Sequence, residues 1–169
     1  MRVHISKISS TCVFQLRCLP KLRSFIDTAS AQRLVSALIL SRADYCNAVL
    51  AGLPTSTLAP LHRVLIAAVR FVAGATSRAH VGGVMKWLHW LPIAHRFLFK
   101  LSVLMHGVYN WTSPSYVIDT TIPISSLSGY RQLRSAMTTE YDIPRTRTQF
   151  GDRAFSVQDL ANRTLCPPI

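Results

Sequence analysis

Apolar residues recur along the first part of the chain at steps of three and four, the spacing that puts them on one face of an α-helix. The first such series is Ile5, Ile8, Cys12, Leu16 and Leu19. Pro20 follows and should end or bend that helix. A second helix should begin at an N-cap formed by Thr28 or Ser30 and run to about Leu50, where the chain turns at Gly52. Its predicted apolar face is Leu34, Leu38, Ser41, Tyr45 and Val49.

The third series is the most regular and predicts a helix from about Ser56 to Ala73, with Gly74 just beyond its C-terminus. Its apolar residues are Leu58, Leu61, Leu65, Ala68 and Val72. A fourth helix is predicted from about Ile93 to Tyr109. Its apolar residues are Phe97, Leu101, Leu104 and Val108. The chain is therefore expected to be mainly α, a small bundle of about four helices.

The composition changes after Trp111, where Ser, Thr and Pro become frequent and a short turn of helix should give way to loop. Arginines with little apolar material follow, so we expect an extended, partly disordered Arg-rich C-terminal part. A last short element could be a helix docked by Phe155, Val157 and Leu160. These patterns predict a helical region over residues 1–111, a linker over 112–149 and a C-terminal element over 150–169.

The segment WLHWLPIAHRFLFKL, Trp87 to Leu101, places two tryptophans beside a Leu-Pro and the start of the fourth helix. A proline suits the first turn of a helix, and large aromatic side chains before it usually pack on the apolar flank. We therefore expect Trp87, Leu88 and Leu91 to form scaffold. Stacking of Trp87 or Trp90 on nucleic-acid bases is the alternative.

Charge changes the picture most. The 169 residues carry 19 Lys and Arg against 7 Asp and Glu, a formal net charge of +12, and fifteen of the cations are Arg. Arginine binds phosphate with two parallel hydrogen bonds and stacks on flat rings, so this composition favours a nucleic-acid partner. The alternative is a poorly balanced surface, or a piece whose acidic partner surface is missing. The expected nucleic-acid contacts are Arg63, Arg70, Lys86, Arg96, Lys100, Arg145, Arg147 and Arg153.

Candidate catalytic chemistry is sparse. A two-metal polymerase or nuclease needs clustered carboxylates, and the seven acids are scattered, with only Glu140 and Asp142 close in sequence. The chain has no phosphate-cradling glycine loop and no G-x-S-x-G turn. Asp44, inside an otherwise apolar helix, is expected to form a structural ion pair or hydrogen-bond hub. No catalytic residue and no cofactor are predicted.

Metal binding is also not expected. The four cysteines, Cys12, Cys18, Cys46 and Cys166, form no C-x-x-C pair and have no histidine at zinc-finger spacing. Without a secretory signal they are expected to be reduced thiols, mostly buried.

The sequence gives partial information on membrane association and cellular location. The longest charge-free stretches, such as Leu101 to Ile118, contain Pro114, Asn110 and hydroxyl residues, so no membrane partner is expected. The first 25 residues hold five cations and no acid, which is also the composition of a mitochondrial transit peptide. We expect a nuclear or cytoplasmic rather than a mitochondrial protein, and not a secreted one.

Four motifs in order carry a family resemblance: SRADYCNAVLAGLP, LHRVLIAAVRFVAG, LHWLPIAHRFLFKL and RTRTQFGDRAFSV. They resemble the region downstream of the catalytic core in LINE-type (non-LTR) retrotransposon reverse transcriptases of the chicken-repeat and jockey-like groups. The resemblance covers nearly the whole chain. It departs at Ile66, where that family has Asn. The family's W-N-S-L-P ending appears here as Asn162-Arg-Thr-Leu-Cys-Pro and loses the Trp, as in a relic copy under weak constraint.

The resemblance implies a helical thumb or connector beside an RNA–DNA hybrid. It carries no activity over, because the catalytic aspartates of that family precede this region and are absent here. The expected function is non-catalytic contact with the backbone of RNA or DNA without sequence preference. The alternatives are a relic product with no evolved activity, exposing the face that met a missing polymerase core, and a small basic mitochondrial protein.

Overall fold

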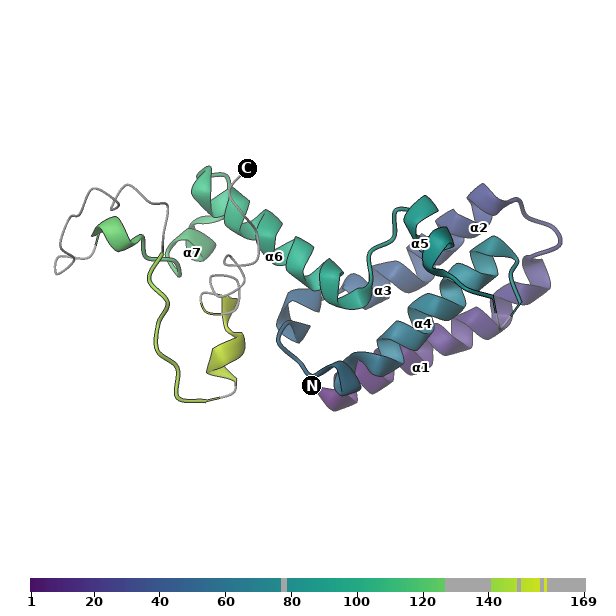
Figure 1. Ribbon diagram of the computed structural model, residues 1–169, viewed down its shortest axis with the longest axis horizontal. Helices are drawn as coiled ribbons and strands as arrows, with labels where there is room; N and C mark the ends of the chain where they lie inside the picture. The colour runs from purple at the N-terminus through teal and green to yellow at the C-terminus, as the bar shows by residue number, and fades with distance from the viewer. Residues whose placement is uncertain (77–78, 127–140, 149, 156, 158–169) are drawn as a thin grey trace. The chain divides into compact units, whose positions relative to one another are not determined.

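The structure is a computed structural model that describes residues 1–76, 79–126, 141–148, 150–155 and 157. Over these residues it is mainly helical, as the periodicity predicts, and contains no β-strand (Figure 1). One isolated antiparallel bridge joins Pro123 and Tyr141. The chain divides into two compact units, Met1–Phe97 and Leu98–Ile169, and each is described separately.

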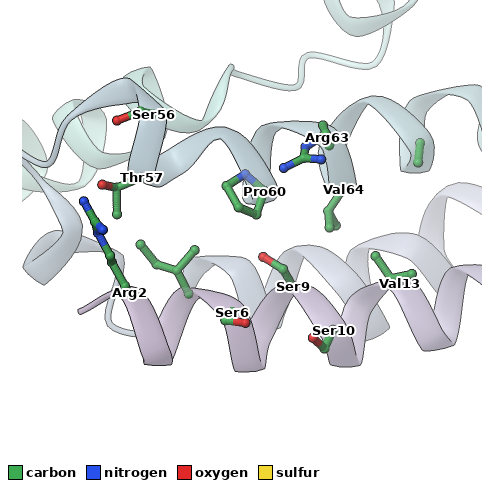
Figure 2. A pocket seen from close by; sticks show the side chains of 12 residues that line it. Arg2, Ser6, Ser9, Ser10, Val13, Ser56, Thr57, Pro60, Arg63 and Val64 are labelled. Carbon is green, nitrogen blue, oxygen red and sulfur yellow. The ribbon is translucent and has the colours of Figure 1, made fainter.

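Three helical segments lie side by side in the first unit (Figure 1). Helix α1 (Arg2–Cys18) continues into the 3₁₀ turn η1 (Leu19–Leu22), where Pro20 stands near the start of the turn. Helix α4 (Thr55–Ala73) packs along α1 and runs in the same direction (Figures 1 and 2). The segment between them runs back and contacts both helices. The predicted face of α1 is confirmed at Ile5, Cys12 and Leu19, which are buried.

The returning segment differs from its prediction. Its N-cap is Asp27, whose carboxylate accepts the Ser30 backbone N–H, so the predicted cap at Thr28 or Ser30 is wrong. It consists of α2 (Thr28–Val35), a π-helical turn η2 (Ser36–Leu40) and α3 (Ser41–Asp44), and the 3₁₀ turn η3 (Asn47–Leu50) follows. The regular helix thus ends six residues before the predicted Leu50, and Cys46 takes a left-handed conformation.

The apolar face of this segment is also not the predicted one. Tyr45 and Val49 are exposed, and the main row of buried residues is spaced by four, with Leu40 buried beside it. The row consists of Ala31, Val35, Ile39 and Ala43. In a uniform α-helix, residues spaced by four drift gradually around the helix axis. A π turn has more residues per turn, so it brings such a row back to the same face. The sequence pattern gives no warning of that turn, because the neighbouring row is equally apolar.

Helix α4 agrees with its prediction. All five residues of the predicted series are buried, together with Val64 and Val69. Gly74 follows with φ of 62°, the left-handed conformation that glycine tolerates, and its N–H bonds the Phe71 carbonyl. By length and composition alone this helix is also able to cross a membrane, a test that core helices of soluble proteins pass as well.

The tryptophan segment is partly scaffold. It contains a short helix, α5 (Gly82–Trp87), that was not predicted. Leu88 and Trp90 are buried, which supports a packing role for this stretch. Trp87 and Leu91 are exposed, at 67% and 41%, so the expectation that they cover the helix flank is wrong. His89 takes a left-handed conformation between the two tryptophans.

Helix α6 (Ile93–Tyr109) has the predicted bounds and crosses from the first unit into the second. In the second unit, Met105 and Val108 form a small buried cluster. Partly buried residues pack against it, namely Val117, Ile118, Tyr141 and Phe155. Helix α7 (Ser115–Ile118) supplies the first two of these and is the short helical turn predicted after Trp111.

The C-terminal predictions are covered only in part. Docking of Phe155 is confirmed, next to the 3₁₀ turn η6 (Gly151–Arg153). Most of the predicted Arg-rich linker, including Arg131 and Arg134, and the docking residue Leu160 lie outside the described residues. The predicted boundaries at residues 111 and 149 remain predictions.

Candidate nucleic-acid interface

The first unit is strongly unbalanced in charge. Its residues include twelve Lys and Arg but only two acids, Asp27 and Asp44, an excess of ten positive charges. Asp27 caps α2, and its pKa is lowered by the hydrogen bond from Ser30. Asp44 is paired with Arg96, whereas Asp27 caps a helix and keeps its negative charge, so the unit stays strongly positive.

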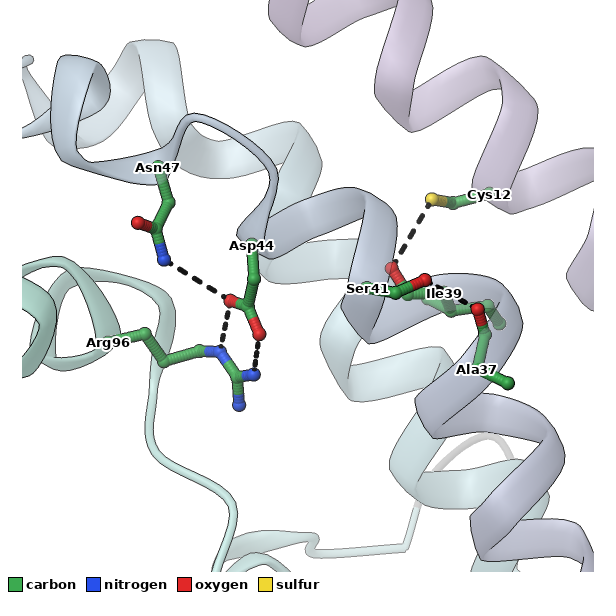
Figure 3. Close-up of polar contacts among 7 residues, drawn as sticks. All are labelled: Cys12, Ala37, Ile39, Ser41, Asp44, Asn47 and Arg96. Atoms are coloured by element: carbon green, nitrogen blue, oxygen red, sulfur yellow. Dashed lines mark hydrogen bonds and ion pairs between the residues drawn. The ribbon is translucent and has the colours of Figure 1, made fainter.

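Asp44 is the hub of a polar cluster (Figure 3). One carboxylate oxygen, Oδ1, accepts the Arg96 Nε–H at 2.8 Å and the Asn47 amide at 3.4 Å, and Oδ2 pairs with Arg96 Nη2. The predicted structural role of Asp44 is therefore confirmed. Arg96 was predicted to contact phosphate. Its charge is instead neutralised by Asp44 and its side chain is only 16% exposed, so we remove it from the candidate contacts.

A second arginine of the unit is also structural. Arg23 donates from Nε to the Phe71 carbonyl at 3.1 Å and from Nη2 to the Val72 carbonyl at 3.2 Å. Its third bond goes to the Ile26 carbonyl. These contacts satisfy carbonyl groups at the C-terminus of α4, where a cation also complements the helix dipole. Arg23 was not among the predicted contacts, and the structure gives it a structural role.

Two grooves flank the N-terminal half of α1, and cations line both. The larger, about 740 Å³, lies between α1 and α4 (Figure 2). Arg63, a predicted contact, stands on its α4 wall, and Arg2 stands at the end near Thr57. The remaining lining residues include several hydroxyl side chains, namely Ser6, Ser9, Ser10, Ser56 and Thr57. The two guanidinium groups and the hydroxyls can bind an anion. The rest of the lining is apolar, namely Ile5, Val13, Pro60, Val64 and Ala67.

The smaller groove, about 410 Å³, lies between α1 and α3. It contains three side chains that are or can become positive, His4, Lys7 and Arg42. Tyr45 also lines it and is 69% exposed, so its ring is accessible for stacking. The sequence-based set missed these residues. The signal was available, because His4, Lys7 and Thr11 repeat at three and four beside the apolar face of α1.

The other predicted contacts are scattered. Arg70 is half-buried and its Nε is buried without a hydrogen-bond partner, whereas Lys86 is exposed on α5. Lys100 is exposed on the part of α6 that belongs to the second unit. Three more lie in that second unit. They are Arg145 and Arg147, both exposed, and Arg153, whose guanidinium lies 5.8 Å from the centre of the Phe150 ring. The predicted eight therefore do not form one surface within a single unit.

The cysteines differ from their prediction. Cys12 is buried and its thiol donates to the Ile39 carbonyl (Figure 3), and burial raises the pKa of this thiol. Cys18 and Cys46 are free and exposed, so the expectation of mostly buried thiols is wrong for these two. Within the part of the chain that the structure describes, no three His, Cys, Asp or Glu side chains are grouped to hold a metal ion.

Comparison of the chain with protein-family models, with curated proteins and with solved structures finds no match in any of the three.

Proposed function

We propose that the first unit binds the sugar–phosphate backbone of RNA or DNA without sequence preference and without catalysing a reaction. The observation that carries the proposal is the placement of charge. Cations line both grooves beside α1, while the two acids of the unit are engaged by Ser30 and Arg96. An uncompensated cation on a rigid helix needs no particular base to bind phosphate, and this favours backbone contact over base readout.

The resemblance to the region behind a retrotransposon reverse transcriptase core suggests which nucleic acid to try first. A thumb or connector in such an enzyme contacts an RNA–DNA hybrid, so we propose the hybrid as the preferred partner. The first unit contributes no carboxylate cluster for metal-dependent phosphoryl transfer, since Asp44 is paired with Arg96 and Asp27 caps a helix. Its proposed role is therefore to hold the nucleic acid.

Binding should be measured by fluorescence anisotropy with a labelled hybrid, single-stranded RNA and single-stranded DNA, and with heparin as competitor. A triple variant, Arg2→Gln with Lys7→Gln and Arg42→Gln, removes cations that line the grooves. A matched control, Arg17→Gln with Lys21→Gln and Arg33→Gln, removes the same charge from exposed positions outside them. We expect the first triple to weaken binding at least about tenfold and the control much less. Equal losses would contradict the proposal.

Exposed aromatic residues support a second candidate, a fragment that needs a missing polymerase core. Phe14, Phe25 and Trp87 of the first unit are each more than two-thirds exposed. Large exposed apolar side chains often mark an interaction surface. In that case the isolated chain should associate or melt without cooperativity. A monomeric elution profile with a cooperative thermal transition would exclude this candidate.

A further inference from the structure

We propose that the groove between α1 and α4 is a binding site for a single phosphate group. The inference deepens the proposed function, on which it rests for the identity of the phosphate carrier, a nucleic-acid chain. The same chemistry would hold a free nucleotide or a diphosphate, and the experiment below separates these sources.

The groove contains a buried hydroxyl group without a hydrogen-bond partner. Ser9 lines the groove and is only 8% exposed, yet its Oγ has no hydrogen-bond partner. Figure 2 shows this oxygen directed from α1 toward the wall formed by α4. A buried hydroxyl without a partner is unfavourable, so each such group calls for an explanation. An incoming phosphate oxygen would accept the Ser9 O–H and remove the deficit.

Two arginines give the groove a positive charge. Arg63 faces Ser9 from the α4 wall, and Arg2 stands near Thr57 at the end of the groove (Figure 2). Both arginines are exposed, and no acid lines the groove. Ser9 Oγ is covered in this conformation, so a phosphate oxygen reaches it only when side chains around it, such as the long and exposed Arg63, move aside. Arginine to phosphate is among the strongest hydrogen-bonded pairs in proteins, because both partners are charged.

The N-terminus of α4 lies at the end of the groove near Arg2 (Figure 2). Ser56 and Thr57, in the first turn of α4, line the groove. That turn contains no acidic residue, and the N-cap, Pro54, offers no side-chain acceptor. The positive end of the helix dipole is therefore not offset locally, and a bound anion would be stabilised there. Ser9 and Arg63 thus supply the direct contacts to the phosphate, while Arg2 and the helix terminus add positive potential at the neighbouring end of the groove.

The experiment uses two probes on the full chain: inorganic pyrophosphate, followed by backbone amide NMR shifts, and a labelled single-stranded oligonucleotide, followed by anisotropy. The variants are Arg63→Gln and Ser9→Ala. Their matched controls are Arg33→Gln and Ser102→Ala, exposed helical positions that do not line this groove. Pyrophosphate should shift the amide signals around Ser9 and Arg63. We expect Arg63→Gln to weaken the binding of both probes about tenfold and Ser9→Ala to weaken it about threefold, with little change in the controls.

The outcomes separate the two proposals. If the oligonucleotide binds but Arg63→Gln loses no more than Arg33→Gln, the groove is not the site and the proposed function stands. If pyrophosphate binding depends on Arg63 and Ser9 while the oligonucleotide does not bind, the site stands, its ligand is a small phosphate and the proposed function fails. If neither probe binds, both proposals are overturned.

Discussion

Asp44 and Arg96 are fifty-two residues apart in sequence and meet in a two-point ion pair, with Oδ1 2.8 Å from Nε and Oδ2 paired with Nη2. The pair fastens the start of α6 to the end of α3 and is partly shielded from water, with side-chain exposures of 35% and 16%. Asn47 adds a third hydrogen bond to the same carboxylate. Arg96, one of the predicted phosphate contacts, is thus part of the scaffold.

Asp44→Asn should destabilise the chain by about 2 kcal/mol, between the values for exposed and for buried ion pairs. Arg96 would then carry an unpaired charge at a position that is only partly accessible to water. Thermal or urea unfolding measures the loss, and Arg96→Met combined with Asp44→Asn completes a double-mutant cycle. Additive effects of the two substitutions would show that the pair does not couple these helices.

Ser9→Ala should change stability and binding in opposite directions. Removing a buried hydroxyl that has no partner, and introducing a better helix former, should raise the free energy of unfolding by about 1 kcal/mol. The same substitution should weaken pyrophosphate binding. Loss of stability would mean that the hydroxyl has a partner inside the protein. The unsatisfied Ser9 hydroxyl would then no longer support the groove site.

The N-cap at Asp27 gives a pH dependence with a definite sign. The Ser30 hydrogen bond lowers the folded-state pKa of this carboxyl below its ordinary value, so its contribution to stability is present above the unfolded-state pKa. That contribution is lost as the pH falls through the lowered value. The stability difference between the wild type and Asp27→Ala should therefore shrink in strong acid. Asparagine also caps helices but carries no charge, so the contribution of the cap to the stability of Asp27→Asn should not vary with pH.

Thiol labelling should rank the cysteines. Cys18 and Cys46 are exposed and should react quickly with iodoacetamide in the native chain. Cys12 is buried and its pKa is raised by burial, so it should react only when the first unit opens. Mass spectrometry of the labelled peptides distinguishes the three sites. Fast labelling of Cys12 under native conditions would contradict the packing of α1 against the returning segment.

Much of the fold is predictable from hydrophobic spacing, and the exceptions have physical causes. The series at Leu58, Leu61 and Leu65 predicts α4 because its spacing of three and four continues without a break almost as far as Gly74. The row at Leu34 and Leu38 is not the buried one. The row beside it is also apolar, and the π turn η2 directs that second row into the core. A local pattern cannot indicate a turn whose register depends on tertiary packing.

The candidate site was less predictable. Arg63 was identified from its position off the apolar face of a regular helix, and it lines the larger groove. Nothing in the local sequence distinguishes Arg96 from Arg63. Its partner Asp44 comes from a distant segment, and only the fold brings the two together. Lys7 and Arg42 were overlooked, because a groove between two helices depends on which faces meet.

Salt-dependent binding of the purified chain to a labelled RNA–DNA hybrid tests the central claim, that the grooves beside α1 hold a nucleic-acid backbone. If Arg2, Lys7, Arg42 and Arg63 each contact one phosphate, the log–log slope of affinity against salt should be about −3 to −4, and changing all four to Gln should nearly abolish it. The control triple at Arg17, Lys21 and Arg33 should keep most of the slope. A slope near zero, or one that both sets of substitutions reduce equally, would contradict the account.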